Sequence, residues 1–140
     1  GGFPVEAFNF EHLNKYPSGA AWVLEFRGDS LNEPFLGVTR LYVNTNHERA
    51  QALLGEKQGV IHTALKYDLI SQMLGAVAAH WPSDGTEDFE PGSVGAVMND
   101  QTNLYLDKDL AEAVDAIVND RARTLALLQE AVSFLKGDAG

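Results

Sequence analysis

Cysteine is absent from this chain of 140 residues, which excludes disulfides, thiolate zinc sites, iron–sulfur clusters and cysteine nucleophiles. A long hydrophobic run is missing too, because Lys66 and Asp68 interrupt the most apolar segment and the stretch 69–79 is too short to span a bilayer. There is also no glycine-rich nucleotide-binding loop and no paired-histidine zinc motif. We therefore predict no membrane association, no metal and no cofactor.

Basic residues are scarce, since 10 lysines and arginines stand against 20 acidic residues and give a net charge of −10. The segment 84–140 holds twelve acids and four bases, so it carries −8 of that charge. Such a surface repels nucleic-acid phosphates and anionic lipids, and it also keeps a domain in solution. No signal-peptide pattern is visible within the sequence, so we expect a cytoplasmic domain, either complete or part of a longer protein.

The length and the apolar fraction of 45% predict one domain over residues 1–140 with a single core. Aromatic and β-branched residues predict strands at 21–26 and 38–43, joined as a hairpin by a turn-rich connection. An extended lead and one helical turn are expected before them. Thr45 and Glu48 form a capping-box pattern that predicts a short helix after the second strand.

A helix over 60–81 is predicted to be the buried centre of the fold, because apolar residues cover most of its circumference. Gly75 lies inside it and costs about 1 kcal/mol of helix propensity relative to alanine. We therefore expect the backbone of a neighbouring element to approach Gly75 closely. Pro82 is expected to end the helix.

The remaining chain is predicted to form a second hairpin, 93–98 with 104–106, although its small residues also suit a helix or irregular packing. A helical segment follows over 108–136, with Lys136 and Gly137 suited to its end. Arg121 interrupts the apolar stripe of this segment, so one bent helix and two shorter helices both fit. The predicted class is α+β, a small antiparallel sheet packed on the central helix and the C-terminal helical segment.

The string Gly28-Asp29-Ser30-Leu31 follows a predicted strand and resembles the nucleophile block of the GDSL esterases and lipases. The resemblance implies a serine nucleophile, a histidine base held by an aspartate, and oxyanion donors from a glycine and an asparagine. It covers four residues, and the family's late Asp-x-x-His block is missing because no histidine has an aspartate three residues before it. A tight turn favours the same glycine, aspartate and serine.

Two groups of polar residues are candidate binding residues. Asn44 and His47 lie where a strand meets a helix, a place where free amides bind anions, although the sequence favours helix capping as the explanation. His62, Lys66 and Asp68 follow a polar strip of the central helix, which predicts a solvated edge, a subunit contact or a cleft. The acidic loop 83–92 lacks the EF-hand spacing for calcium, so it is interpreted as a solvated loop.

No catalytic constellation is assembled in the sequence, which favours a non-catalytic protein-interaction or assembly domain. The expected contact is with a protein partner or a second copy of the chain. It would use an open sheet edge or the last helix, whose surplus apolar residues are Ala122, Ala126, Leu127, Ala131 and Phe134. The alternative is a small hydrolase or ligand-binding domain with a polar cluster around Asp29 and Ser30 or around His47 and His62.

Overall fold

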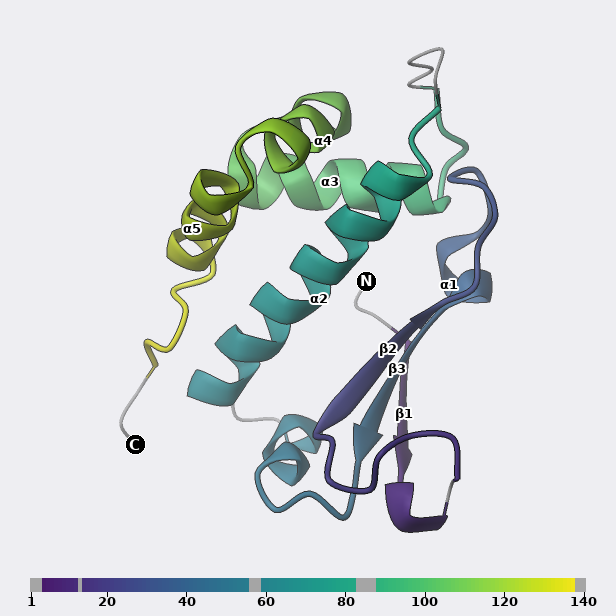
Figure 1. Cartoon of the computed structure of the whole chain (residues 1–140), viewed down its shortest axis with the longest axis vertical. Helices are drawn as coiled ribbons and strands as arrows, with labels where there is room; N and C mark the ends of the chain where they lie inside the picture. The colour runs from purple at the N-terminus through teal and green to yellow at the C-terminus, as the bar shows by residue number, and fades with distance from the viewer. Residues whose placement is uncertain (1–3, 13, 56–58, 83–87, 138–140) are drawn as a thin grey trace.

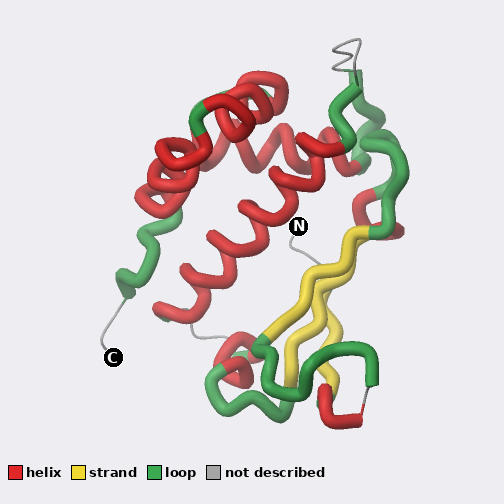
Figure 2. Tube along the Cα trace, viewed as in Figure 1, coloured by secondary structure: helices red, strands yellow, loops and turns green. Residues whose placement is uncertain are grey.

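The computed structural model describes residues 4–12, 14–55, 59–82 and 88–137. It has an α+β fold in which a three-stranded sheet from the N-terminal part is followed by helices (Figure 1). The four longer helices lie together on one side of the sheet, as Figure 2 shows. None of the helices in the described ranges is both long enough and apolar enough to cross a membrane.

The sheet is built around β3 (Thr39–Asn44), which lies between β1 (Val5–Phe8) and β2 (Trp22–Phe26). β2 runs antiparallel to β3 with Leu24 opposite Leu41, which confirms the predicted hairpin. β1 pairs with β3 in the parallel direction. The prediction of a purely antiparallel sheet is therefore wrong. The extended N-terminal segment forms β1 and joins the sheet as a third strand, parallel to β3.

Side chains alternate between the two faces of the sheet, as the twofold period of a strand requires. Thr39, Leu41 and Val43 are buried on the face that packs against the helices, whereas Arg40 and Tyr42 on the opposite face are half-buried. We call this opposite side the outer face. The connection from β2 to β3 contains the one-turn helix α1 (Phe35–Val38), and the 3₁₀ turn η1 (Phe10–His12) follows β1.

The central helix α2 spans Val60–Ala79, slightly less than the predicted 60–81, because His80 already leaves the helical conformation before Pro82. Leu65 and Leu69 pack with the sheet on one flank. The opposite flank packs with the C-terminal helices. Its buried residues there are Ile70, Met73, Leu74 and Val77. The remaining side of α2 stays open, and Gly75 on it is exposed.

The predicted second hairpin is wrong, because residues 94–106 form the helix α3 (Val94–Leu106). Ser93 caps it, since its hydroxyl oxygen accepts a hydrogen bond from the Ala96 amide at 3.1 Å. Asp100 and Leu104, which a strand would place on the same face as Met98 and Thr102, are exposed, so the burial pattern fits a helix and not a strand. The buried residues are Val94, Gly95, Met98, Thr102 and Leu106.

The C-terminal segment forms two helices, α4 (Leu110–Asn119) and α5 (Arg121–Ala131). Asp109 caps α4 reciprocally with Glu112, whose amide donates to the Asp109 carboxylate at 2.8 Å. Asp120 takes φ −145° and ψ 64°, values outside the helical region, so the chain breaks between the two helices. Of the two alternatives left open by the sequence, the structure has the pair of shorter helices.

The helical segment ends five residues earlier than the predicted 136. Ser133 and Leu135 take positive φ angles of 56° and 63°, which a right-handed helix cannot contain. The chain turns toward α2 there, and the Leu135 amide donates to the Thr63 hydroxyl oxygen at 3.0 Å. Lys136 and Gly137 therefore lie beyond the helix and do not cap it.

Two helical glycines have opposite surroundings. A Cβ atom added to Gly75 would meet no heavy atom within 4 Å, so the expected close approach of a neighbouring element is wrong. A Cβ atom added to Gly95 would lie only 2.3 Å from Cδ1 of Phe89. Packing inside the fold therefore requires a glycine at position 95 but not at position 75.

Candidate functional site

Asn44 is completely buried at the end of β3, and its side chain is used within the fold. Its Oδ1 accepts hydrogen bonds from the amides of Phe10 at 3.1 Å and Asn46 at 3.0 Å. Its Nδ2 donates to the carbonyls of Ser18 at 2.9 Å and Ala20 at 2.7 Å. The residue joins three segments of the N-terminal part through four hydrogen bonds.

His47 caps the 3₁₀ turn η2 (Ala50–Leu54). Its Nδ1 accepts hydrogen bonds from the amides of Arg49 and Ala50, each at 3.1 Å. The predicted capping box of Thr45 and Glu48 does not form, because the Thr45 amide donates to the Phe8 carbonyl at 2.7 Å instead. The turn is 3₁₀ in character and starts later than the predicted helix.

The three candidate residues of α2 have different partners. The Gly59 amide donates to Nδ1 of His62 at 3.1 Å, so this ring caps the first turn of α2. Lys66 is exposed. Asp68 accepts hydrogen bonds from the Trp22 indole and from Nε2 of Gln72, both at 2.7 Å, and thereby connects α2 to β2. His62 and Asp68 are about 120° apart around the helix axis, so they do not face one cleft.

Ser30 lies in a turn stabilised by backbone amides. Its hydroxyl oxygen accepts from the Asn32 amide at 3.2 Å. One carboxylate oxygen of Glu33 accepts from the amides of Asp29 at 2.7 Å and Ser30 at 2.9 Å. Within the described ranges, the hydrogen bonds of histidine ring nitrogens go to backbone atoms and none goes to Ser30.

One edge of the sheet is formed by β2, and its pairing with β3 shows which backbone groups are free. The Arg27 amide donates to the Val38 carbonyl at 2.8 Å, and the Asn44 amide donates to the Ala21 carbonyl at 2.9 Å. In an antiparallel pair every second residue points its backbone groups at the partner strand. The residues between them direct their N–H and C=O groups away from β3, at the open edge. They are Trp22, Leu24 and Phe26.

No hydrogen bond within the described part of the chain reaches these edge groups. The side chains of Trp22, Leu24 and Phe26 are only half-buried, whereas Leu41 on the same face of β3 is 1% exposed. Edge strands are usually protected by lysine, proline or a bulge, and β2 contains neither residue type. The β2 edge is therefore an open strand edge whose side chains on the inner face are apolar.

Charged residues on the outer face form a small network beside this edge. The Glu25 carboxylate lies 2.7 Å from the Lys15 ammonium and 2.7 Å from the Arg27 guanidinium. Burial by itself would raise the pKa of Glu25, but the hydrogen bond from Lys15 and the charges of both cations outweigh it and lower that pKa. Glu25 is 10% exposed, while its partners are 55% and 67% exposed.

Aromatic rings lie on the outer face as well. The rings of Phe8 and Tyr42 stack with centroids 5.1 Å apart, and Tyr16 lies 6.3 Å from Tyr42. Phe10 continues the row at 6.1 Å from Tyr16. The segment between β1 and β2 thus covers part of the outer face.

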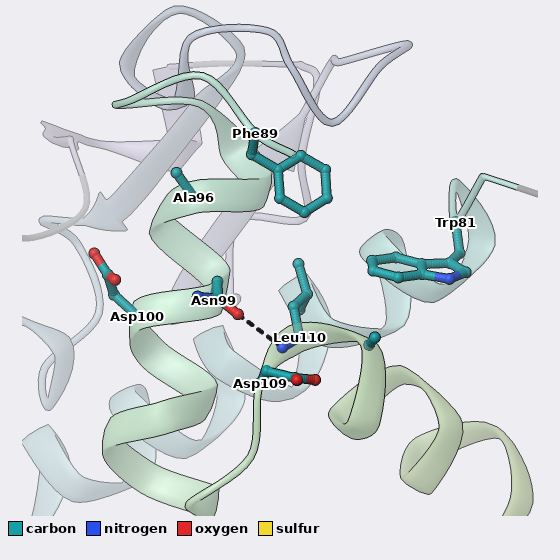
Figure 3. Close-up of a pocket in the computed structure, with 8 residues that line it drawn as sticks. Trp81, Phe89, Ala96, Asn99, Asp100, Asp109 and Leu110 are labelled. Atoms are coloured by element: carbon teal, nitrogen blue, oxygen red, sulfur yellow. Dashed lines mark hydrogen bonds between the residues drawn. The ribbon is translucent and has the colours of Figure 1, made fainter. Parts of the chain in front are cut away.

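A separate cleft of about 320 Å³ lies between α3, the start of α4 and an aromatic pair (Figure 3). Trp81 and Phe89 form this pair, with ring centroids 6.2 Å apart. The Leu110 amide donates to Oδ1 of Asn99 at 2.9 Å and so holds α4 against α3. The lining residues are Trp81, Phe89, Ala96, Asn99, Asp100, Asp109, Leu110 and Ala111.

Comparison with models of known protein families, with curated proteins and with solved structures finds no match to this chain. The sequence predicted one of the two surfaces, the open sheet edge, but not the cleft between α3 and α4. An open sheet edge is among the expected contact surfaces. The cleft is not, because half of its lining residues lie in segments predicted as a hairpin and a loop. Asp84 and Glu87 of the acidic loop lie outside the described residues.

Proposed function

We propose that this chain is a non-catalytic protein-interaction domain that binds an extended segment of a partner protein as an additional strand on β2. The observation that carries the proposal is the set of unpaired backbone groups of Trp22, Leu24 and Phe26. A partner strand offers donors and acceptors at the same spacing, so it satisfies all three residues in register.

The last helix supports such a contact less well. Leu127 and Phe134, the two large members of its apolar surplus, pack against the core. The members that remain exposed are the alanines at 122, 126 and 131. Small side chains bury little apolar area in a contact, so they contribute little to affinity.

The open side of α2 leaves room beside the β2 edge. Asp68 is bonded to Trp22 of this strand, and seven residues make nearly two helical turns, so Gly75 lies on the same side of α2 as Asp68. A Cβ atom added to Gly75 would meet no heavy atom of another element within 4 Å. The backbone of a bound partner segment can therefore approach α2 at Gly75. This contact would explain the glycine, which packing within the chain does not explain.

The charges beside the edge favour an acidic side chain on the partner. Lys15 and Arg27 are both more than half exposed, and Glu25 balances one of their two charges. This excess of positive charge stands out on a chain with a net charge of −10. An acidic residue on the outer side of the bound segment would pair with it, and would set its position along β2.

Peptides selected from a random displayed library on the wild-type chain test the proposal, with Leu24→Pro and Leu24→Ala as a matched pair. Proline at position 24 removes an edge amide but no hydrogen bond to β3, and edge strands tolerate it there. Alanine removes the same side chain and keeps the amide. We expect selected peptides to bind Leu24→Pro at least about tenfold more weakly than Leu24→Ala, as measured by fluorescence anisotropy.

Circular dichroism and thermal unfolding of both variants check that each one remains folded. The proposal is lost if the library yields no binders, or if the binders have equal affinity for the two variants. Sedimentation equilibrium of the same proteins shows whether a second copy of the chain occupies the edge, because Leu24→Pro would then separate the copies and Leu24→Ala would not.

A further inference from the structure

We infer that the cleft between α3 and α4 binds an organic cation, a protonated amine or a guanidinium group. This site is separate from the β2 edge, since residues of the sheet do not line it. Its volume of about 320 Å³ lies within the usual range for a small-molecule site. The chemistry of its walls decides which ligand fits.

Aromatic rings form one wall of the cleft. Trp81 and Phe89 are inclined by 59° to each other, with centroids 6.2 Å apart, and both rings lie at the same end of the cleft (Figure 3). The face of an aromatic ring carries negative electrostatic potential and attracts a cation, most strongly in tryptophan. An ammonium or guanidinium group is therefore favoured there over a neutral group.

The charged lining residues are both acidic. Asp109 comes from the N-terminal cap of α4, and Asp100 comes from α3 with its carboxylate pointing away from the aromatic pair (Figure 3). Among the residues that the structure describes, no lysine or arginine lines the cleft. The ion pairs found in the described ranges all involve Glu25 or Glu6 of the sheet, so neither aspartate is neutralised by a neighbouring base. An anionic ligand would be repelled by the Asp109 carboxylate, whereas a cation would be attracted to it.

The walls are held in place before any ligand binds. Phe89 packs directly on Gly95, where any side chain would collide with the ring. The hydrogen bond between Asn99 and the Leu110 amide fixes the distance between the two helices. Asp109 is fixed by its reciprocal bonds with Glu112. A site that needs no rearrangement avoids the ordering cost of binding.

The test is an NMR titration of the wild-type chain that follows the Trp81 indole and the Leu110 amide. The probes are butylammonium and butylguanidinium, with butanol as the neutral compound of similar shape. In a second set of titrations, Nα-acetyl-lysine amide, whose side chain keeps its ammonium group, and a short arginine peptide are the probes. They distinguish binding of a free amine from binding of a side chain of a polypeptide. We expect saturable shifts with the cations and none with butanol.

Asp109→Asn provides the decisive variant, because asparagine caps a helix as well as aspartate but carries no charge. We expect it to weaken cation binding about fivefold, while Glu130→Gln, an equal loss of charge on exposed α5, leaves binding unchanged. Trp81→Leu should weaken binding while both carboxylates remain. Equal binding of butanol, equal effects of the two charge variants, or shifts that never saturate would each overturn the inference.

Discussion

Replacement of Gly75 by alanine is expected to stabilise the protein. The residue lies inside α2, has no positive φ, and offers empty space to 4 Å around a new Cβ atom. Only helix propensity changes, so the free energy of unfolding should rise by about 0.8–1 kcal/mol. For 140 residues, with an unfolding entropy of about 2.1 cal/mol/K per residue, this corresponds to a rise in Tm of about 3 °C.

Gly95→Ala is the matched control, because it makes the same chemical change in a helix where the neighbour is only 2.3 Å away. We expect it to destabilise the fold by about 1–3 kcal/mol, since Phe89 must move. Urea unfolding followed by circular dichroism measures both variants. A loss of stability in Gly75→Ala, or the same sign of change in the two variants, would refute the packing described here.

The same position links stability to the proposed function. Gly75→Leu extends a side chain into the space beside β2, so peptides selected on the β2 edge should bind it more weakly than Gly75→Ala. The core does not contact this position, so stability should stay within about 1 kcal/mol of the wild type. Unchanged peptide affinity would place the bound segment away from α2.

Three further substitutions test single residues by urea unfolding. Thr39→Val should stabilise by about 1 kcal/mol, because the buried Thr39 hydroxyl has no hydrogen-bond partner within the described ranges. Asn44→Ala should cost about 3 kcal/mol or more, because it leaves four backbone groups unpaired; a loss under 1 kcal/mol would contradict this. Glu25→Gln should destabilise at pH 7. The folded-state pKa of Glu25 is lowered, so its stabilisation exists above the unfolded value near 4.5 and disappears as pH falls through the folded value. Wild type and variant should therefore converge at low pH, and a difference that persists there would refute the ion pairs.

Local patterns determined the strands β2 and β3 and the helix α2. Their residues agree in propensity and in period, and the hairpin joins segments that are close along the chain, so local information is sufficient. The prediction of a hairpin over 93–106 was wrong for the opposite reason. The small and polar residues of this segment suit several conformations, and burial of one side against α4 and α5 selects the helix.

The candidate binding residues show the same limit. Asn, His and Asp at strand and helix ends serve equally well as ligands or as caps, and the sequence alone does not distinguish these uses. The structure assigns hydrogen bonds within the fold to Asn44, His47, His62 and Asp68. Lys66 is the exposed member of the set.

The sequence by itself determined the acidic charge, the α+β class, the hairpin and the central helix, because composition and periodicity are local properties of the chain. Only the tertiary structure decided that β1 joins β3 in parallel, that β2 is left as an open edge, and that a cleft forms beside Trp81. These features depend on which distant segments meet. Their free energies come from contacts between residues far apart in the sequence, and local patterns do not encode those contacts.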